Sequence, residues 1–595
     1  AQLAHSALML HCPHPVLAEV CEFLCGRGDV AWRSAQPLPL RAVCKDWRNR
    51  IDQHCISHLS IKYERVSPVL GLTKSQRDRL HARGRPSDSI LTRVRSVRSA
   101  VIEPVEPSLV YSDASPFLSF LSNLRLATHL TFVPSQHALD EGGFVRALEQ
   151  VNALQHCSTV HAVSASKLAM GDKAVGSLLR QLAQPPGATP IRRLDLSSNN
   201  LNRAGSGVLE AMTAPRFRDL RELNMRGNWI GASGARELSR VSASMPQLRH
   251  LNLQSCCLDR PGARALASAM QVWPLLEHLD VCNNFFGFGA VQELAAAIGA
   301  ATRLRCLVLS RNALGNASVF ALGKTMVHSA ALEELHLERC SLDDGCADTL
   351  SALLQRLPGL RQLSLGDNAL SHRAMQGMSR ALLGMRDMQG VSVRHCGVMD
   401  EGFRELCASL RGAAGLHSLD VGSNSISGAG IQHIHMLHAE CKLRSFNNRM
   451  NPIGSAGMAS LGSWLLSHGA ELEYLQLSWN SLDADGCTSL RQALAHLPKL
   501  QELVLVGNVI GDEACAGLLD TLGRSHCART LQVLDLSWNN LTDESESPLK
   551  RAIKRLPLLH TLRIASNFMS PSTQRRLLKA GSERSPPLLH MTKPT

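Results

Sequence analysis

Histidine and cysteine residues gather in two short segments near the start of the sequence, where they could in principle bind a metal ion. Residues 11–25 hold two histidines and three cysteines, and residues 54–58 hold two histidines and one cysteine. Imidazole and thiolate groups are the usual zinc ligands. However, no C-x-x-C pair occurs and neither segment forms a convincing zinc motif. Packing and surface positions account for these residues better, so the sequence predicts no metal site and no cofactor.

Motifs that carry catalytic chemistry are missing from the sequence. It contains no GxxxxGK[ST] phosphate-binding loop, no GxSxG nucleophile elbow and no HExxH zinc helix. Single cysteines, histidines and aspartates are scattered through the chain, but a catalytic triad requires a geometry that scattered residues do not establish. We therefore expect a protein that is not an enzyme.

Composition restricts the class of protein. Of 595 residues, 44% are apolar but only 4% are aromatic, so the core must be built mainly from leucine, alanine, valine and methionine. The 18 cysteines are scattered as in reduced, intracellular proteins, and neither a secretory leader nor an apolar run long enough to span a membrane is seen. We expect a cytoplasmic location, with the cilium, the cytoskeleton or the nucleus as alternatives.

A repeated pattern, L-x-x-L-x-L-x-x-N/C-x-L, dominates the sequence from Ile191 onward. Fourteen copies follow one another with a mean spacing near 28 residues, which excludes chance. The copies start at Ile191, Leu220, Leu248, Leu276, Leu304, Leu332, Leu360, Met388, Leu416, Leu443, Leu472, Leu500, Leu531 and Leu559. This is the leucine-rich repeat signature.

Each copy predicts one short strand and one helix. The L-x-L alternation places leucines on one face of a strand, and the ninth residue, usually asparagine, can bond backbone groups of neighbouring coils where the chain turns. A segment with apolar residues at helical spacing follows. Units of this size must stack to bury both faces. The predicted fold class is therefore α/β, a leucine-rich-repeat solenoid.

The repeat length and the mixture of asparagine and cysteine at the ninth position resemble the ribonuclease-inhibitor-like subclass of leucine-rich repeats. The resemblance implies a curved horseshoe with parallel strands on the concave face and helices on the convex face. One copy departs from the pattern, because Asn448 replaces its third leucine, and we expect a local irregularity there. Degenerate copies are expected at "ISHLSI", "ATHLTFVPS" and "STVHAVSASKL".

Two short helical patterns precede the repeats. The segments "CPHPVLAEVCEFL" and "LRAVCKDWRNRID" resemble the F-box, whose pattern runs roughly L-P-x-E-[VIL]-L…L-x-x-V-C-[KR]-x-W. Cys12 and Pro15 depart from it. The resemblance implies docking to a Skp-type linker protein bound to a cullin. The residues expected to dock are Val16, Leu17, Val20, Leu40, Val43 and Trp47. The same helices could instead serve only as a cap for the solenoid, which needs a polar-faced end.

These patterns divide the chain into four predicted segments. An F-box-like helical module spans 11–63, a basic linker with degenerate repeats spans 64–189, the clear repeats span 190–570, and a cap helix with a flexible tail spans 571–595.

The linker contains a strongly basic stretch. From Lys74 to Arg98 eight basic residues face two aspartates, which is nearly half of the net charge of +13. Its basic residues are Lys74, Arg77, Arg79, Arg83, Arg85, Arg93, Arg95 and Arg98. It could contact RNA or an acidic protein surface such as tubulin, although such runs are usually only solvated and no stacked aromatics support RNA binding.

The repeat register also indicates which side chains face the concave side, namely positions 2, 3, 5, 7 and 8 of each copy. Trp, Tyr and Arg residues dominate protein-interface hot spots. The concave-face residues expected to bind are Arg193, Arg226, Arg249, Arg311, His336, Arg339, Tyr474, Trp479 and Trp538. Trp479 and Trp538 occupy equivalent positions two repeats apart, which is unusual in a chain with few aromatics. Flanking helices or a terminal segment could instead cover them.

The sequence therefore predicts a non-enzymatic protein-interaction protein. The first hypothesis is an F-box-type substrate receptor of a cullin-RING ubiquitin ligase that binds its target on the concave face. The second is a scaffold subunit of a ciliary or microtubule complex or of a ribonucleoprotein, which would suit the basic charge. The third is an inhibitor or small-GTPase regulator of the leucine-rich-repeat type.

Overall fold

The structure, a computed structural model, describes residues 159–184, 187–202, 208–327 and 329–583, together with four short strands outside these ranges. The chain divides into two compact units, with the boundary between Phe285 and Phe286. Apart from one strand, the predicted F-box-like module lies outside the described residues, and so does the basic stretch from Lys74 to Arg98. The docking and RNA-binding or tubulin-binding predictions for these segments stay predictions.

In the first unit, short parallel strands pair in chain order from β1 to β8. The pairing keeps one register, so that Leu194, Leu223, Leu251 and Leu279 stand opposite one another in successive strands. The strands are β1 (His58–Ile61), β2 (Ser99–Ile102), β3 (His129–Phe132), β4 (Ala162–Ser164), β5 (Arg193–Asp195), β6 (Glu222–Asn224), β7 (His250–Asn252) and β8 (His278–Asp280).

Helical segments connect these strands. The α-helices and 3-10 helices (η) of the first unit are α8 (Gly171–Ala183), η5 (Leu209–Thr213), η6 (Pro215–Phe217), α9 (Gly231–Val241), η7 (Ser242–Ser244) and α10 (Arg260–Met270).

The second unit continues the same plan, with parallel pairing in chain order from β9 to β19. Its strands are β9 (Cys306–Val308), β10 (Glu334–His336), β11 (Gln362–Ser364), β12 (Gly390–Ser392), β13 (Ser418–Asp420), β14 (Ser445–Asn447), β15 (Tyr474–Gln476), β16 (Glu502–Val504), β17 (Val533–Asp535), β18 (Thr561–Arg563) and β19 (His590–Met591).

The helices of the second unit lie between these strands along the chain. They are α11 (Phe288–Ala300), α12 (Asn316–Thr325), η8 (Asp344–Cys346), α13 (Ala347–Gln355), α14 (His372–Gly384), α15 (Met399–Ser409), η9 (Leu410–Gly412), α16 (Gly428–Ile431), η10 (Gln432–Met436), α17 (Gly454–His468), η11 (Gly469–Glu471), α18 (Ala484–Leu494), α19 (Gly511–Arg524), η12 (His526–Arg529), η13 (Asp543–Ser545), α20 (Glu546–Arg555) and α21 (Pro571–Ser582).

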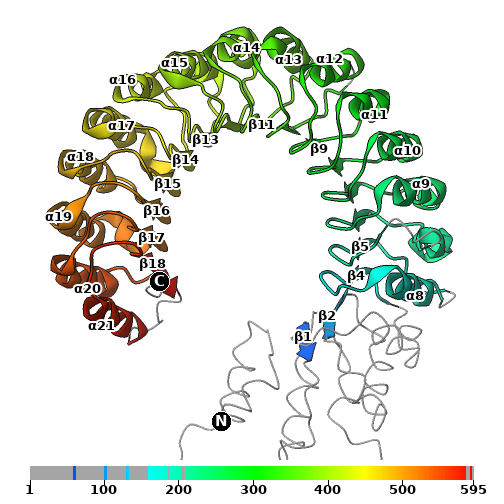
Figure 1. Ribbon diagram of the computed structural model, residues 1–595, viewed down its shortest axis with the longest axis horizontal. Helices are drawn as coiled ribbons and strands as arrows, with labels where there is room; N and C mark the ends of the chain where they lie inside the picture. The colour runs from blue at the N-terminus through cyan, green and yellow to red at the C-terminus, as the bar shows by residue number, and fades with distance from the viewer. Residues whose placement is uncertain are drawn as a thin grey trace, which may run out of the picture. The chain divides into compact units, whose positions relative to one another are not determined.

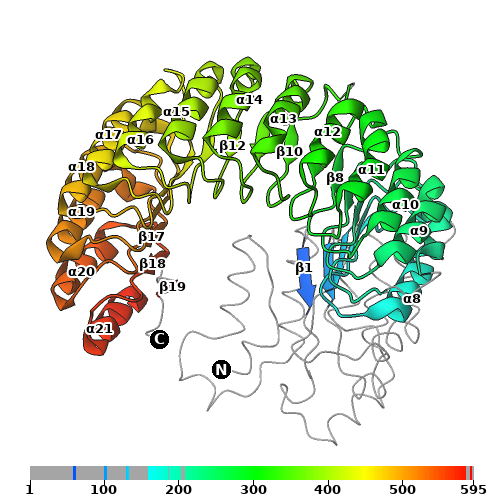
Figure 2. The same cartoon turned by 45° about the horizontal axis from the view of Figure 1, so that its top comes forward.

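Each unit is built from two layers, strands on one side and helices on the other (Figure 1). The tilted view in Figure 2 shows the helices as the outer layer of the second unit. Neighbouring strands lie about 4.7–4.9 Å apart, whereas packed helices need about 8–10 Å. The helical layer is therefore longer than the strand layer, which bends a stack of such repeats toward its strands. The predicted leucine-rich-repeat solenoid is confirmed.

The core lies between the two layers and consists of the repeated leucines. In the repeat that starts at Leu500, for example, Leu503 and Leu505 are fully buried, and so is Leu518 of helix α19. Because each copy contributes only a few apolar side chains, the core of a copy is completed by its neighbours. This explains why such a chain can fold with few aromatic residues.

The asparagine at the ninth position links neighbouring coils, as the sequence predicted. The Nδ2 of Asn228 donates to the carbonyl of Leu196 in the preceding coil, at 3.0 Å, and to Met225 in its own coil, at 2.8 Å. Its Oδ1 accepts the backbone N–H of Asn199 at 2.9 Å. The asparagine is buried, and these bonds satisfy backbone groups that the turn would otherwise leave unpaired. At Cys256 the thiol donates to the carbonyl of Met225 instead.

The repeat with Asn448, where the sequence led us to expect a local irregularity, keeps a regular strand. Strand β14 pairs in register with both of its neighbours, so the departure is confined to side chains. Asn448 is fully buried, donates from Nδ2 to Oδ1 of Asn480 at 2.7 Å, and accepts from Nδ2 of Asn451 at 2.9 Å. A closed amide network replaces the missing leucine, because each buried polar group finds a partner.

The upstream segments with degenerate patterns do form strands, namely β1, β3 and β4. Strand β2, directly after the basic stretch, was not anticipated, because its sequence, SAVI, has no leucine framework. At the other end, the expected terminal helix is α21. The short strand β19 pairs with β18 in the segment that was predicted to be a flexible tail. Among the described residues, no helix has the length and apolar character needed to cross a membrane.

Candidate protein-binding surface

The first and third residues of each strand project from the face of the sheet that lies opposite the helices, which we call the inner face. In β5, for example, Leu194 is buried whereas the flanking Arg193 and Asp195 are not. Alternation along the strand separates the two sets of side chains. The inner face is therefore lined by non-leucine residues in columns that run from repeat to repeat.

One of these columns is structural. Where the third strand residue is aspartate or asparagine, its Oδ1 accepts the backbone N–H two residues later. Asp195 does so with Ser197 at 2.9 Å, Asn252 with Gln254 at 2.9 Å, and Asp535 with Ser537 at 3.0 Å. This local bond shapes the turn after the strand. These carboxylates and amides are therefore partly engaged by their own backbone.

The arginines predicted on the inner face of the first unit are largely paired with glutamates of the next repeat. Arg193 contacts Glu222 at 2.9 Å, and Arg249 contacts Glu277 at 2.7 Å. Arg226 follows β6 and is exposed. A groove of about 520 Å³ runs over these strands, with His129 near one end and His278 near the other. Its lining mixes apolar with polar side chains, and the charge of Arg193 is balanced by Glu222.

A histidine lies next to this groove. Burial, the neighbouring His129 and Arg192 lower the pKa of His161, so its ring is held neutral near physiological pH. The rings of His129 and His161 meet edge to face with centroids 4.9 Å apart. A neutral histidine here adds no positive charge to the paired arginines.

The middle repeats place Arg311 and Arg339 at the eighth position, where the backbone φ is positive, and both side chains are exposed. His336 ends strand β10 and lies 3.6 Å from Glu334. Further along, Asp367 pairs with Arg394 at 3.1 Å and with His395 at 3.0 Å. Burial alone would raise the pKa of Asp367, but its bonds to His395 and Arg394 lower it.

The late repeats carry an aromatic pair. Trp479 and Trp538 both occupy the eighth position, two repeats apart, and their ring centroids lie 6.3 Å apart with a tilt of 43°. Their exposed fractions are 45% and 56%. A separation below 7 Å with this tilt is typical of interacting rings. The structure therefore brings together two of the residues that the sequence singled out.

The repeat between the two tryptophans makes room for this pair with a glycine at the same position, Gly507. Its φ is +68°, and a Cβ added there would collide with Cδ2 and Cε2 of Trp479 and lie 2.6 Å from Cε3. The indole ring of Trp479 therefore lies directly against the Gly507 backbone. Any other residue would push the ring away, so this glycine is part of the surface.

Apolar neighbours extend the pair into a patch. Val504 and Val506 lie on the intervening repeat, and Tyr474 begins the strand that leads to Trp479; all three are partly exposed. We call Tyr474, Trp479, Val504, Val506 and Trp538 the aromatic patch. Burial raises the pKa of Tyr474, so the phenol stays protonated and can donate a hydrogen bond.

The backbone conformation of the two tryptophans has an energetic cost. Trp479 and Trp538 have φ values of 57° and 58°, a left-handed conformation that costs residues other than glycine about 1–2 kcal/mol. Most other repeats use small or polar residues there, such as Ser198, Ser423 and Asn283. Half-exposed rings recover little of this cost by burial. Two bulky aromatic residues therefore stand in a strained, partly exposed position.

Sequence reasoning missed two features of the inner face. The role of Gly507 is invisible without knowing that the tryptophan ring leans over the next repeat. A second cluster, Cys306, Glu334 and His336, was also missed. Aligning the repeats would have placed Cys306 and Glu334 in one column, which is the signal that could have found it.

Comparison with known proteins agrees with the repeat architecture. Residues 218–239, 244–267, 496–519 and 527–545 match the family described as Leucine Rich repeat. The ribonuclease inhibitor of Sus scrofa is 31% identical over 270 residues, which cover 40% of this chain and 59% of the inhibitor. NACHT, LRR and PYD domains-containing protein 12 of Mus musculus is 31% identical over 202 residues, which cover 33% of this chain and 19% of that protein.

Among solved structures, an internalin from Listeria monocytogenes aligns with 72% of this chain and 89% of its own, with 14% identity and a TM-score of 0.34. That likeness adds nothing about function. The chain spans only 59% and 19% of the two relatives named above. The chain thus carries leucine-rich repeats whose relatives include ribonuclease inhibitor.

Proposed function

We propose that this protein is a non-enzymatic binding protein that captures a protein partner on its inner face, with the aromatic patch as the anchor. The observation that carries the proposal is the tryptophan pair, two half-exposed and mutually tilted rings in a strained backbone conformation, with the ring of Trp479 against Gly507. Tryptophan and tyrosine that become fully desolvated dominate the energy of protein interfaces. A partner that covers the patch with apolar side chains gains binding free energy, because apolar surface of both proteins is removed from water.

The charged residues of the inner face support a different role in the same complex. Arg193 and Arg249 are already paired within the chain, so a partner gains little by replacing those contacts. Such residues set orientation and association rate more than affinity. The repeats from β5 to β8 are therefore proposed as a polar guide and the late repeats as the anchor.

The relatives favour binding over catalysis. One of them is named an inhibitor of ribonuclease, a name that describes action on another protein. An inhibitor-type role on a protein target is compatible with the same inner-face surface. The sequence lacks the phosphate-binding loop, the nucleophile elbow and the zinc helix motifs named above.

At a finer level, we propose that the chain acts as an F-box-type substrate receptor of a cullin-RING ubiquitin ligase. Support comes from the pattern that includes Val43, Cys44, Lys45 and Trp47, placed ahead of a leucine-rich solenoid. In such an arrangement residues 11–63 would dock a Skp-type linker protein, and the repeats would hold the substrate. These residues lie outside the described part of the chain, so the sequence alone supports this step.

Affinity capture with the full chain tests the anchor. We expect the double variant Trp479→Ala, Trp538→Ala to lose the partners that the unchanged protein retains, with each substitution costing about 2 kcal/mol of binding. Trp229→Ala is the matched control, because Trp229 is 68% exposed but belongs to the first unit and is not one of the residues of the aromatic patch. Retention of the same partners by the double variant would rule out the anchor.

A separate pair of substitutions tests the ligase hypothesis. Val43→Ala together with Trp47→Ala should release a Skp-type linker and cullin while the inner-face partner stays bound. If the unchanged chain captures no cullin but copurifies in fixed proportion with tubulin or RNA, the scaffold alternative replaces the receptor. If the two substitutions instead lower the melting temperature of the repeats, the helices serve as a cap.

A further inference from the structure

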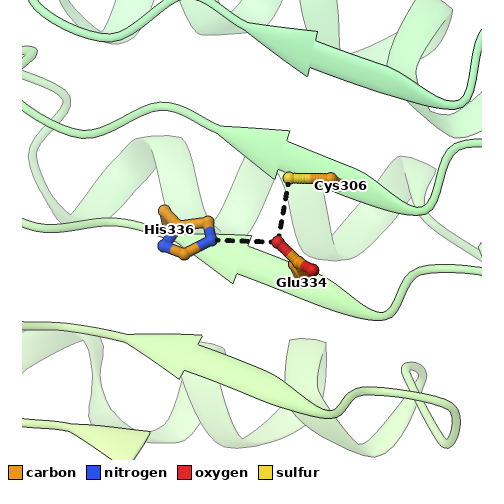
Figure 3. A group of neighbouring side chains, drawn as sticks. All are labelled: Cys306, Glu334 and His336. Carbon is orange, nitrogen blue, oxygen red and sulfur yellow. Dashed lines mark hydrogen bonds and ion pairs between the residues drawn. The ribbon is translucent and has the colours of Figure 1, made fainter. Parts of the chain in front are cut away.

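Three side chains with different metal-binding atoms converge on the inner face of the second unit (Figure 3). Cys306 begins strand β9, and Glu334 and His336 begin and end the adjacent strand β10. Parallel pairing places Cys306 opposite Glu334 and Val308 opposite His336. Their thiol sulfur, carboxylate oxygen and imidazole nitrogen all lie within 4.8 Å of one another.

The separations fit a tetrahedral metal ion. The Sγ of Cys306 lies 3.3 Å from Oε2 of Glu334, and Nε2 of His336 lies 3.6 Å from the same oxygen. A tetrahedral zinc ion with ordinary bond lengths of about 2.0–2.3 Å separates its ligand atoms by about 3.4–3.6 Å. The three groups can therefore close on one ion with only small side-chain movements.

The charge around Glu334 distinguishes it from the other inner-face glutamates. Glu222 and Glu277 each contact an arginine, and Glu333 contacts two. Within the described part of the chain, the only ion pair of Glu334 is with His336. Cys306 stands in the repeat column where Arg193 pairs with Glu222 in the first unit. The thiol of Cys306 thus stands at the repeat position where an arginine would form an ion pair with the carboxylate of Glu334.

The backbone holds the cluster in place. Two ligands come from one strand at i and i+2, which lie on the same face, and the third comes from the paired neighbour. Cys306 is only 7% exposed, whereas Glu334 and His336 reach toward solvent. The buried thiol would lie at the base of the site, and the open side would face the inner surface.

We propose that Cys306, Glu334 and His336 form a zinc site with an open fourth position. A thiolate, a carboxylate and a neutral imidazole together balance the charge of Zn²⁺. Binding releases the thiol proton of Cys306 to solvent, because the thiolate is the ligand. Water fills the fourth position in the free protein. Since that position faces the inner surface, a side chain of a bound partner can replace the water.

Cobalt substitution tests this site in the purified, reduced full chain. Co²⁺ added to the protein should produce a thiolate-to-cobalt charge-transfer band and the visible bands of tetrahedral cobalt, saturating at one ion per chain. Zn²⁺ should displace it and abolish both signals. Cys306→Ser should remove the charge-transfer band, and His336→Gln should weaken Zn²⁺ affinity more than about tenfold.

The chain contains other cysteines, so a matched control is essential. Cys257→Ser removes the one described cysteine that is not buried, and it should leave the cobalt spectrum unchanged. Glu334→Gln keeps the size of the side chain, so a weakened affinity in that folded variant shows a role in metal binding. Persistence of the charge-transfer band in Cys306→Ser, or no tetrahedral spectrum in the unchanged protein, would overturn the proposal.

Discussion

In the repeats of strands β5 to β8 two arginines of the inner face are paired with glutamates, whereas the repeats of strands β15 to β17 expose aromatic and aliphatic side chains. Arg193 and Arg249 lie against glutamates of the next repeat. The rings of Trp479 and Trp538 lie next to each other, and that of Trp479 lies against Gly507. Both regions use the same repeat, with the same register and the same turn.

This difference shows how one scaffold supports two kinds of surface. Exposed ion pairs contribute roughly 0–1 kcal/mol each, and a partner must desolvate them before gaining anything. Aromatic rings lose no strong hydration when covered, and they bury large apolar areas with little loss of conformational freedom. We therefore expect affinity to concentrate in the late repeats.

Among the single substitutions considered below, the largest effect is expected at Gly507. In Gly507→Ala the new methyl group collides with the ring of Trp479, so the aromatic pair opens and partner binding should weaken by about 2 kcal/mol. The positive φ adds a loss of folding stability of about 1–2 kcal/mol. Titration calorimetry and urea unfolding measure the two effects.

Gly511→Ala separates these effects. Gly511 has a φ of +70° but nothing within 4 Å of an added Cβ, so this variant carries the same backbone strain without disturbing Trp479. Its stability should fall as in Gly507→Ala, and its partner affinity should not change. Equal affinities in the two variants would show that the ring position does not matter.

The next effect concerns the amide network that precedes the aromatic patch. Asn448→Leu restores the repeat consensus but removes the partner of Oδ1 in Asn480 and one of the acceptors of Nδ2 in Asn451, which still donates to the carbonyl of Val421. We expect a net destabilisation of about 1 kcal/mol, because the lost hydrogen bonds of these buried amides outweigh the gain from leucine. Urea unfolding measures it, and an increase in stability would mean that the network is dispensable.

A smaller effect is expected in the early repeats. Arg193→Ala and Arg249→Ala should each change partner affinity by less than about 1 kcal/mol. They should alter the association rate and its salt dependence more than the dissociation rate. Surface plasmon resonance at two salt concentrations can check this. If either arginine variant lost as much partner affinity as the tryptophan variants, affinity would not be concentrated in the late repeats.

The smallest effect is a pH dependence at the end of the late repeats. Hydrogen bonds from Arg576 and Lys550 lower the pKa of Glu546 from 4.5 to about 2. Because the folded pKa is depressed, the stabilisation is present above pH 4.5 and is lost as the pH falls toward 2. Glu546→Gln should flatten the fall in melting temperature over this window, whereas the exposed neighbour Glu544→Gln should not.

Much of the fold could be predicted because the leucine pattern is repeated. Leucine spacing sets the strand register, and Asn228 and its equivalents mark each turn. Strand β2 escaped prediction because SAVI alone carries no such framework. Asn448 marked a local departure from the pattern, but its hydrogen bonds to Asn451 in the same repeat and to Asn480 in the next could not be read from the leucine spacing.

The candidate site was only partly accessible from the sequence. Position in the repeat indicated that Trp479 and Trp538 share a column, but not that the two rings contact each other or that Trp479 lies against Gly507. Ion pairing of Arg193 and Arg249 depends on the residue facing each of them across the sheet, which requires exact register. For the same reason the contact between Cys306, Glu334 and His336 was not predicted from the sequence. The position of a residue in its repeat can be read from the sequence. Which side chains of neighbouring repeats touch one another can be read only from the structure.

The central claim, that a partner is anchored on the late repeats, is tested most directly by hydroxyl-radical footprinting of the unchanged protein with and without its captured partner. This measurement reports the solvent exposure of individual tryptophan side chains. We expect Trp479 and Trp538 to become several-fold less reactive in the complex, while Trp229 keeps its reactivity as an internal reference. Unchanged reactivity of Trp479 and Trp538 in a saturated complex would contradict the account.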